Sequence, residues 1–244
     1  RDAYIFELYR AQISKNYETE LVKRGIEHIP IAYRKLRTAR GSGKSSIDFA
    51  KEAFEEIISR GSCIVVTLDI SKYFENLDHA KIYQLWSQLL SQPKLPRDHL
   101  AVFKAITRYV EVDRDLAYER LGIIGALSGT SRKGFLRKRA DIPTQLCTPK
   151  EFREKICGEG GKWPKLLQPN RYTFGIPQGA PISDLIANFY LLDFDAAVYD
   201  ECKKFAGYYR RYCDDIILIL PDDDVVWHHL DSFAKSQIKV AGAQ

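Results

Sequence analysis

The 244 residues include no methionine, few histidines and no apolar run as long as the ~18 residues that a membrane-spanning helix needs. No charged segment followed by an apolar stretch opens the sequence. We therefore expect no leader peptide, no membrane partner and a cytoplasmic location. Because the first residue is Arg1 and methionine is absent throughout, the positions of both ends are treated as arbitrary.

Paired cysteines are also missing. The five cysteines form no CxxC pair and show no regular spacing, which argues against a zinc site or a disulfide framework and favours reduced thiols. What is present is a mild excess of positive charge, net +5 with a pI near 8.8. That excess is compatible with a polyanionic partner, but many proteins without one carry as much, so it decides nothing alone.

The apolar pattern predicts helices and strands along most of the sequence. Between Glu111 and Tyr172 the periodicity fades, and a segment of that length is expected to be an insertion or a functional connection. The regular elements are expected as helices over 1–25, 46–61, 78–92, 97–110, 182–205 and 222–238, and as strands over 63–69 and within 207–220.

Three acidic residues stand at the ends of apolar strands. Asp69 follows "CIVVTL", and Asp214 with Asp215 precedes "IILIL". Adjacent residues of a regular strand point to opposite faces, so these two neighbours share a site only where the chain turns. We expect "YCDD" at the tip of a hairpin, next to the end of the strand that carries Asp69.

Carboxylates gathered in this way repel one another unless a cation is present. Oxygen ligands without a cysteine pair or a nearby histidine favour magnesium over zinc. Two such ions, roughly 3.5 to 4 Å apart, are the device by which polymerases and nucleases activate a hydroxyl. The alternative is that Asp69 and Asp214 cap turns and that Asp215 is solvated.

The stretch "FGIPQGAPISDLIAN", residues 174–188, joins a loop rich in glycine and proline to the start of a helix. Such a loop lets backbone approach a flat or anionic ligand closely, and Gln178 would then hydrogen-bond a nucleotide. The alternative is a strand-to-helix connection whose glycines merely make the turn.

Together these motifs carry a resemblance. "TLDISKYFENLDH", "GIPQGAPISDLIAN" and "YCDD", in this order, resemble the palm motifs of reverse transcriptases, in particular the prokaryotic group of retron, group II intron and phage-defence enzymes. The resemblance covers about residues 47–220. It implies an α+β fold, with a ferredoxin-like antiparallel palm sheet backed by helices and a helical fingers portion. The expected division is fingers over 1–61, palm over 62–244 with a connection at about 111–172, and no thumb in this chain.

The resemblance also implies roles for the acidic residues. Asp69 and Asp214 would bind both Mg²⁺ ions, for which Mn²⁺ would substitute, and Asp215 would complete the acidic cluster. The carbonyl of Ile70 would join the metal shell. The implied enzyme is a nucleotidyltransferase in which a primer 3'-hydroxyl attacks a dNTP in line and releases pyrophosphate.

A nucleotide pocket is implied by the same family. Phe74 would pack beneath the sugar and exclude a 2'-hydroxyl, while Gln178 and Gly179 would line the pocket for nucleotide and template. Partners would be an RNA template, a DNA or RNA primer and dNTPs.

Basic stretches fit a template-binding role, with solvated surface charge as the alternative. Arg210 and Arg211 flank the acidic turn, where they would offset its charge or contact primer phosphate. The other candidate cations fall in two clusters: Arg34, Lys35, Arg37, Arg40 and Lys44, and then Arg132, Lys133, Arg137, Lys138 and Arg139.

Some features depart from the family pattern. "YCDD" stands where "YADD" is commoner, and no cations that would bind a triphosphate are recognisable before Tyr33. "AYRK" and "YCDD" favour the antiphage-defence enzymes, which work with a cognate non-coding RNA. The alternatives are a group II intron or retron enzyme, a catalytically silent palm that acts as an RNA-binding scaffold, and a cyclic-nucleotide synthase on a related palm.

Overall fold

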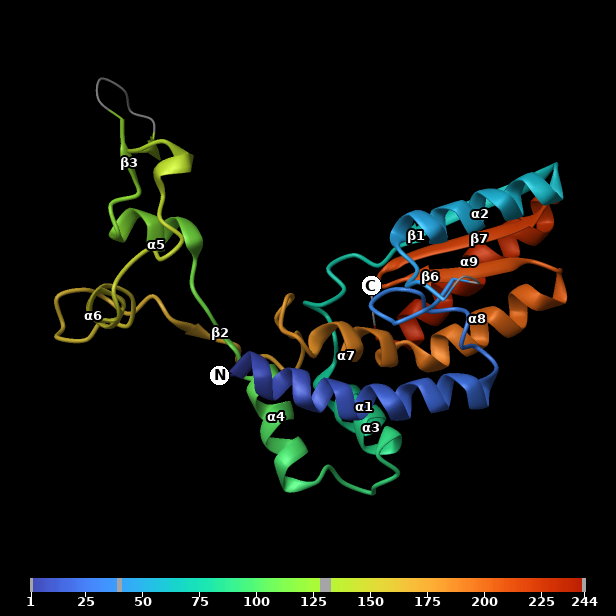
Figure 1. Cartoon of the computed structure of the whole chain (residues 1–244), viewed down its shortest axis with the longest axis horizontal. Coiled ribbons are helices and arrows are strands. Elements are labelled where there is room, and N and C mark those ends of the chain that lie inside the picture. The colour runs from blue at the N-terminus through green and yellow to red at the C-terminus, as the bar shows by residue number, and fades with distance from the viewer. Residues whose placement is uncertain (1, 39–40, 128–132, 243–244) are drawn as a thin grey trace. The chain divides into compact units, whose positions relative to one another are not determined.

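The structure is a computed structural model that describes residues 2–38, 41–127 and 133–242 (Figure 1). The chain divides into two compact units, a larger one formed by Arg1–Thr107 with Tyr172–Gln244 and a smaller one formed by Arg108–Arg171. The smaller unit covers nearly the same residues as the connection expected over about 111–172. The division into fingers and palm at residue 61 stays a prediction, because both parts belong to the larger unit.

A three-stranded antiparallel sheet is the centre of the larger unit, with strand order β1-β7-β6. Strand β1 (Cys63–Asp69) pairs along its whole length with β7 (Asp215–Pro221), and β6 (Tyr208–Tyr212) pairs with the other edge of β7. The β-branched and aliphatic residues of both runs suit a pleated, half-buried surface. The strands predicted from the sequence are therefore confirmed.

Helices cover this sheet (Figure 1). Helices α8 (Leu192–Lys204) and α9 (Asp224–Val240) pack against each other, and α9 also contacts β7 and β1. Helix α2 (Ser46–Arg60) contacts β7 as well, although none of its residues is buried. The fold is thus a mixed α+β arrangement with small antiparallel sheets.

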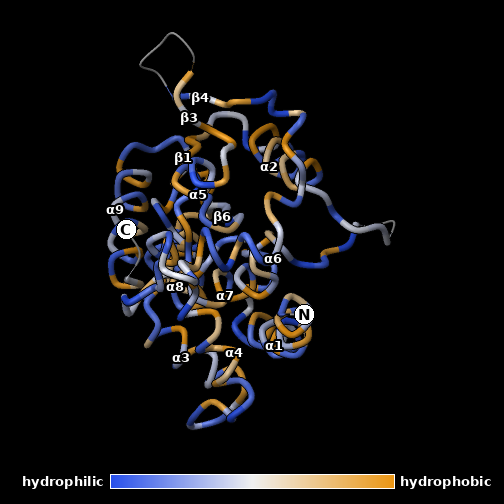
Figure 2. The backbone as a smooth tube through the Cα atoms, turned by 90° about the vertical axis from the view of Figure 1, so that its left-hand side faces the viewer, coloured by the Kyte–Doolittle hydropathy of each residue, from blue (hydrophilic) through white to orange (hydrophobic). Residues whose placement is uncertain are grey.

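The remaining helices of the larger unit form a second layer around α1 (Asp2–Arg24), which buries Ile13, Tyr17 and Leu21 at helical spacing. Figure 2 shows both hydrophobic and hydrophilic residues along α1. Helices α3 (His79–Leu89), α4 (Arg97–Thr107) and α7 (Ser183–Tyr190) pack against α1, and Arg24 of α1 forms an ion pair with Asp193 of α8.

The single helix expected over 182–205 is wrong in one respect: it is broken at Leu191 into α7 and α8. The reason lies in the last carbonyls of α7, which other groups occupy in place of the next helical turn. The Tyr73 hydroxyl donates to the Ala187 carbonyl at 2.6 Å, and the Arg211 guanidinium donates to the Asn188 carbonyl at 3.2 Å. A helix end buried with its carbonyls satisfied in this way is stable.

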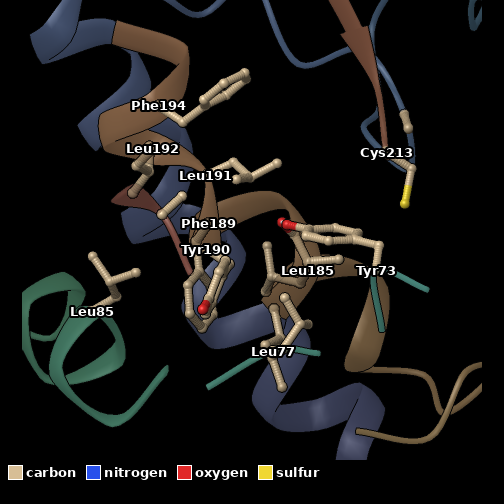
Figure 3. Packing of buried hydrophobic residues seen from close by; sticks show 14 of the residues in the cluster. Tyr73, Leu77, Leu85, Leu185, Phe189, Tyr190, Leu191, Leu192, Phe194 and Cys213 are labelled. Carbon is tan, nitrogen blue, oxygen red and sulfur yellow. The ribbon is translucent and has the colours of Figure 1, made fainter. Parts of the chain in front are cut away.

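The buried residues of α7 and α8 pack with the segment that follows β1 (Figure 3). Tyr73 is 2% exposed, and its ring lies edge-on to Phe74 and Tyr190 at centroid separations of 5.8 and 6.4 Å. Figure 3 shows the Cys213 thiol and the Tyr73 ring on the same side of this packed cluster. The core thus reaches directly beneath the "YCDD" turn.

The smaller unit is built from short elements. Its described residues form two antiparallel pairs, β2 (Val110–Glu111) with β5 (Gln168–Pro169) and β3 (Ile124–Ala126) with β4 (Lys133–Phe135). Its helical turns are α5 (Arg114–Arg120), a 3-10 turn (Arg139–Asp141), α6 (Pro149–Glu151) and a π-helical turn (Phe152–Ile156). Among the described residues of the whole chain, no helix has the length and apolar character to cross a bilayer.

Candidate active site

The three aspartates lie at one end of the central sheet. In the β1–β7 register Asp69 is directly opposite Asp215, and in the β6–β7 register Tyr212 is opposite Asp215 as well. Cys213 and Asp214 are therefore the two residues of a tight hairpin turn. The Ile70 amide donates to the Asp214 carbonyl at 3.2 Å, which ties the turn to the end of β1. The predicted placement of the hairpin tip beside Asp69 is confirmed.

Cys213 gives the turn its shape. Its φ of 59° is in the left-handed region, which is costly for a residue with a side chain and persists only where surroundings hold it. The side chain is 2% exposed, and the Cys213 carbonyl accepts a hydrogen bond from Arg211 at 2.8 Å. Burial, followed by the charge of Asp214, raises the pKa of the Cys213 thiol to about 12.

The electrostatics of Asp215 reflect the negative charges beside it. The pKa of Asp215 is raised by its partial burial and then by the negative charges of Asp214 and Asp69. Neither neighbouring arginine offsets this charge. Arg211 is paired with Asp195 at 2.7 Å, and the guanidinium of Arg210 lies 4.4 Å from the centre of the Tyr208 ring.

The fit of a divalent cation to this end of the sheet rests on backbone register and charge. Oxygen donors of a kind that Mg²⁺ prefers converge there and repel one another. Within the described part of the chain, however, no three His, Cys, Asp or Glu side chains stand ready-made as a metal-ligand group. The aspartates thus satisfy the chemistry of the donor set without forming a closed cage.

The loop with Gln178 and Gly179 is tied to the segment after β1. The Ile176 amide donates to the Phe74 carbonyl at 2.9 Å, and the Ser183 hydroxyl donates to the Pro177 carbonyl at 2.7 Å. Gln178 and Gly179 are exposed, and Gly179 has a φ of 93° with open space where a Cβ would lie. Glycine is the residue that adopts this conformation without strain.

The Phe74 side chain is more buried than we expect of a residue that lines a nucleotide pocket. Its side chain is only 9% exposed and packs with the hydrophobic core beside Tyr73. The structure therefore joins Phe74 and the Gln178 loop through backbone hydrogen bonds, while most of the Phe74 ring faces the interior.

Two of the predicted nucleic-acid contacts are wrong. Arg211 is 0% exposed and is held by Asp195, so it reaches neither phosphate nor the acidic cluster. The Arg34 side chain is 4% exposed, since it forms an ion pair with Glu18 and donates to the carbonyls of Glu27 and Pro30. Sequence alone did not separate these internal cations from surface ones.

Other predicted contacts remain accessible. Lys35 and Arg37 are exposed, and Arg37 and Lys44 border a cavity of about 210 Å³ that also includes Arg210. Burial, followed by the nearby charge of Arg210, lowers the pKa of His28 at the same cavity. The predictions for Arg40 and Arg132 lie outside the described residues.

The residue that sequence reasoning missed is Asp195. It is 0% exposed, accepts from Arg211 at 2.7 and 2.8 Å and accepts from the Tyr209 hydroxyl at 2.6 Å. A signal was present, because Asp195 lies at helical spacing from the buried Leu191, Val198 and Cys202. An acidic residue on an apolar helix face is a sign of a buried partner.

The comparisons with known proteins concern the fold. No protein-family model matches the sequence, and no curated protein matches it. Telomerase from Candida albicans, solved in complex with a TWJ fragment of telomeric RNA, is similar in structure with a TM-score of 0.50 and 14% sequence identity. Apo telomerase from Candida tropicalis, truncated from its C-terminal domain, is similar with a TM-score of 0.46 and 9% identity.

The similarity covers 98% of this chain but only 32% of the Candida albicans chain, so the chain spans about a third of that protein. Telomerase is a reverse transcriptase, and the chain therefore has a reverse-transcriptase-like fold. The likeness concerns the arrangement of helices and strands.

The repulsion at the sheet end generates a prediction about stability. Asp215→Asn is expected to stabilise the metal-free protein at neutral pH, because it removes a charge that the folded state disfavours. Because the folded state raises the pKa of Asp215 above its ordinary 3.8, protonation favours folding below that value, and this benefit is lost as pH rises through the raised pKa. The stability gain of the variant should therefore grow with pH across that window.

Thermal unfolding as a function of pH, with and without Mg²⁺, measures this effect. Asp200→Asn, an exposed position of α8, is the control for loss of one negative charge. Mg²⁺ should raise the Tm of the wild type more than that of Asp215→Asn, because a ligand stabilises the state that binds it. A variant less stable than the wild type at every pH would contradict the repulsion.

Proposed function

We propose that this chain is the polymerase core of an RNA-directed DNA polymerase that extends a primer on an RNA template. The observation that carries the proposal is the register that sets Asp69 opposite Asp215, with Asp214 at the hairpin tip between β6 and β7. Three carboxylates on a rigid sheet end, in a reverse-transcriptase-like fold, suit two-metal nucleotidyl transfer.

Asp69 and Asp214 would hold two Mg²⁺ ions, with Asp215 and the Ile70 carbonyl beside them, and Mn²⁺ would substitute. When bound, such ions lower the pKa of the attacking 3'-hydroxyl and stabilise the leaving pyrophosphate oxygen. The protein supplies a fixed geometry: β7 is paired on both sides, so Asp215 is held in place as reactants arrive.

The dNTP would lie over the segment that follows β1. There the loop of Gln178 and Gly179 is hydrogen-bonded to the backbone of Phe74 through Ile176. Gln178 would contact the nucleotide and template, and the accessible edge of Phe74 would lie against the sugar. The exposed cations Lys35 and Arg37, with the half-buried Arg210, would contact primer or template phosphate.

The smaller unit is the electropositive part of the chain. Its residues, 108–171, include fourteen Lys and Arg against eight Asp and Glu, a net charge of +6, whereas the rest of the chain carries −1. An open cavity of about 800 Å³ in this unit is lined by Tyr118, Phe135 and Arg139 among others, and the Arg139 guanidinium lies 4.8 Å from the Phe135 ring centre. Aromatic rings among cations suit stacking of single-stranded bases.

Arg137, Lys138 and Arg139 are the exposed cations that we assign to template RNA. None of the three forms an ion pair within the described residues, in contrast to Lys150, Arg153 and Lys155, which pair with glutamates of the same unit. Unpaired cations neutralise phosphate at lower cost, because no internal partner has to be displaced.

Within the reverse transcriptases, we propose the prokaryotic group, and in it an antiphage-defence enzyme that acts in the cytoplasm with a cognate non-coding RNA. The motifs "AYRK" and "YCDD" support this assignment. A group II intron or retron enzyme is the next candidate. A catalytically silent palm that scaffolds RNA is the alternative of another class, favoured by the charge of the smaller unit alone.

Catalysis is tested by primer extension on an RNA template with Mg²⁺. Asp214→Asn is expected to reduce extension by ~10³-fold, because the metal contribution to the transition state amounts to several kcal/mol. Asp200→Asn, on the exposed side of α8, should retain wild-type rates. Binding of the same RNA without extension by the wild type would favour the silent scaffold.

Sugar selection is tested at Phe74. Phe74→Val is expected to raise incorporation of ribonucleotides relative to dNTPs by roughly 10- to 100-fold, the range that one added contact in a pocket provides. Leu77→Val also shortens a buried side chain of the same segment, at a core residue that is 0% exposed, and should leave selectivity unchanged. Selectivity equal to the wild type in both variants would make Phe74 a packing residue only.

Template contact is tested by charge reversal in the smaller unit. Replacement of Arg137, Lys138 and Arg139 by Glu should weaken RNA binding and reduce the slope of log Kd against log salt by about 2, the value for three phosphate contacts. The matched control reverses Lys150, Arg153 and Lys155, which changes the net charge equally at paired positions. Fluorescence anisotropy over a salt series measures both. If both triple variants weaken RNA binding equally, the overall positive charge of the unit attracts RNA, and specific contacts from Arg137, Lys138 and Arg139 are ruled out.

A further inference from the structure

An ion pair is fully buried beneath the hairpin tip. Asp195 and Arg211 are both 0% exposed, and the guanidinium meets the carboxylate with two parallel hydrogen bonds of 2.7 and 2.8 Å. Burial of both charges is expensive, and an apolar pair of similar volume often serves stability as well or better. The pair therefore calls for a role in addition to holding the fold together.

The rest of the guanidinium shows where that role lies. It donates from Nη1 to the Cys213 carbonyl at 2.8 Å and from Nη2 to the Asn188 carbonyl at 3.2 Å. The backbone of Arg211 is also occupied, since its amide donates to the Ile29 carbonyl and its carbonyl accepts from the Ile31 amide. One side chain thus joins α8, the end of α7 and the hairpin turn, while its backbone anchors the segment before Tyr33.

The hydrogen bond from Arg211 to the Cys213 carbonyl affects the acidic residues through the peptide group between Cys213 and Asp214. The Cys213 carbonyl belongs to the peptide group that joins Cys213 to Asp214. Because a peptide group is planar, the orientation of this carbonyl fixes the position of the Asp214 Cα. Cys213 is in the left-handed region, which needs an outside partner to persist. The guanidinium is a rigid planar donor, and Asp195 prevents it from turning.

We propose that Arg211, held by Asp195, is a positioning residue that fixes the Cys213–Asp214 peptide and so sets the affinity of the aspartates for divalent cations. The proposal rests on the proposed two-metal function and deepens it. Arg211 touches neither metal nor substrate. Arg211 acts by orienting the hairpin turn, in the way that a residue hydrogen-bonded to a metal ligand orients that ligand.

The test compares variants that separate this contact from general stability. Arg211→Met combined with Asp195→Leu replaces the ion pair by apolar side chains and removes the donor to Cys213. Arg211→Lys keeps the charge but loses the planar fork. Tyr209→Phe is the control, because it removes the hydrogen bond from the Tyr209 hydroxyl to Asp195 and leaves every donation of Arg211 in place.

Mn²⁺ binding to the full chain without nucleotide is measured by the EPR signal of free Mn²⁺, alongside thermal unfolding and the Mg²⁺ dependence of primer extension. The double variant and Arg211→Lys should each bind Mn²⁺ roughly 10- to 100-fold more weakly, the usual effect of losing an outer partner. Their extension should recover at high Mg²⁺. Tyr209→Phe should lower the Tm and leave the Mn²⁺ affinity unchanged.

Wild-type Mn²⁺ affinity in Arg211→Lys, or in a folded double variant, would overturn the proposal. So would a Tyr209→Phe variant that loses as much affinity as the others, because general loosening would then explain the effect. Arg211→Lys decides the question if the double variant does not fold. A wild-type chain that neither binds Mn²⁺ nor extends a primer would instead overturn the proposed function, which keeps the two failures distinct.

Discussion

Like charges held opposite each other on paired strands are the constraint on which the rest of the larger unit depends. The β1–β7 register sets Asp69 and Asp215 directly opposite each other. The hairpin turn between β6 and β7 then places Asp214 beside them. A sheet end that gathers like charges depends on strands that are fixed elsewhere. The alternate residues Ile216, Leu218 and Leu220 fix β7 from below, since all are 2% exposed or less.

Much of the architecture around that constraint follows from local pattern. The strands at Cys63–Asp69 and Asp215–Pro221, and the turn between Tyr212 and Asp215, could be predicted because strand period and flanking charge act over a few residues. The break at Leu191 could not, since it depends on donors from Tyr73 and Arg211, far away in the sequence. Apolar periodicity continues through such a break and gives no sign of it.

Charged side chains show the same limit. Arg210 and Arg211 are neighbours with the same chemistry, yet the first lies over a tyrosine ring and the second is wholly enclosed. Strand alternation predicts that only one of the two side chains points into the core, but it does not predict which residue pairs with it there. Arg34 is hidden by Glu18 for a similar reason. The sequence position of Asp195 gives a clearer sign of burial than that of either arginine, because Asp195 lies on the apolar face of its helix.

The hairpin tip has one further chemical consequence. A thiolate, and not a thiol, is the form of cysteine that oxidants and alkylating agents attack. Burial and the charge of Asp214 keep Cys213 protonated at cellular pH, with a pKa of about 12. In the metal-free chain, the acidic tip therefore carries a thiol of low reactivity. Because the Cys213 side chain is 2% exposed and interacts with Asp214 and Tyr33, oxidants that modify exposed thiols are expected to react with it slowly.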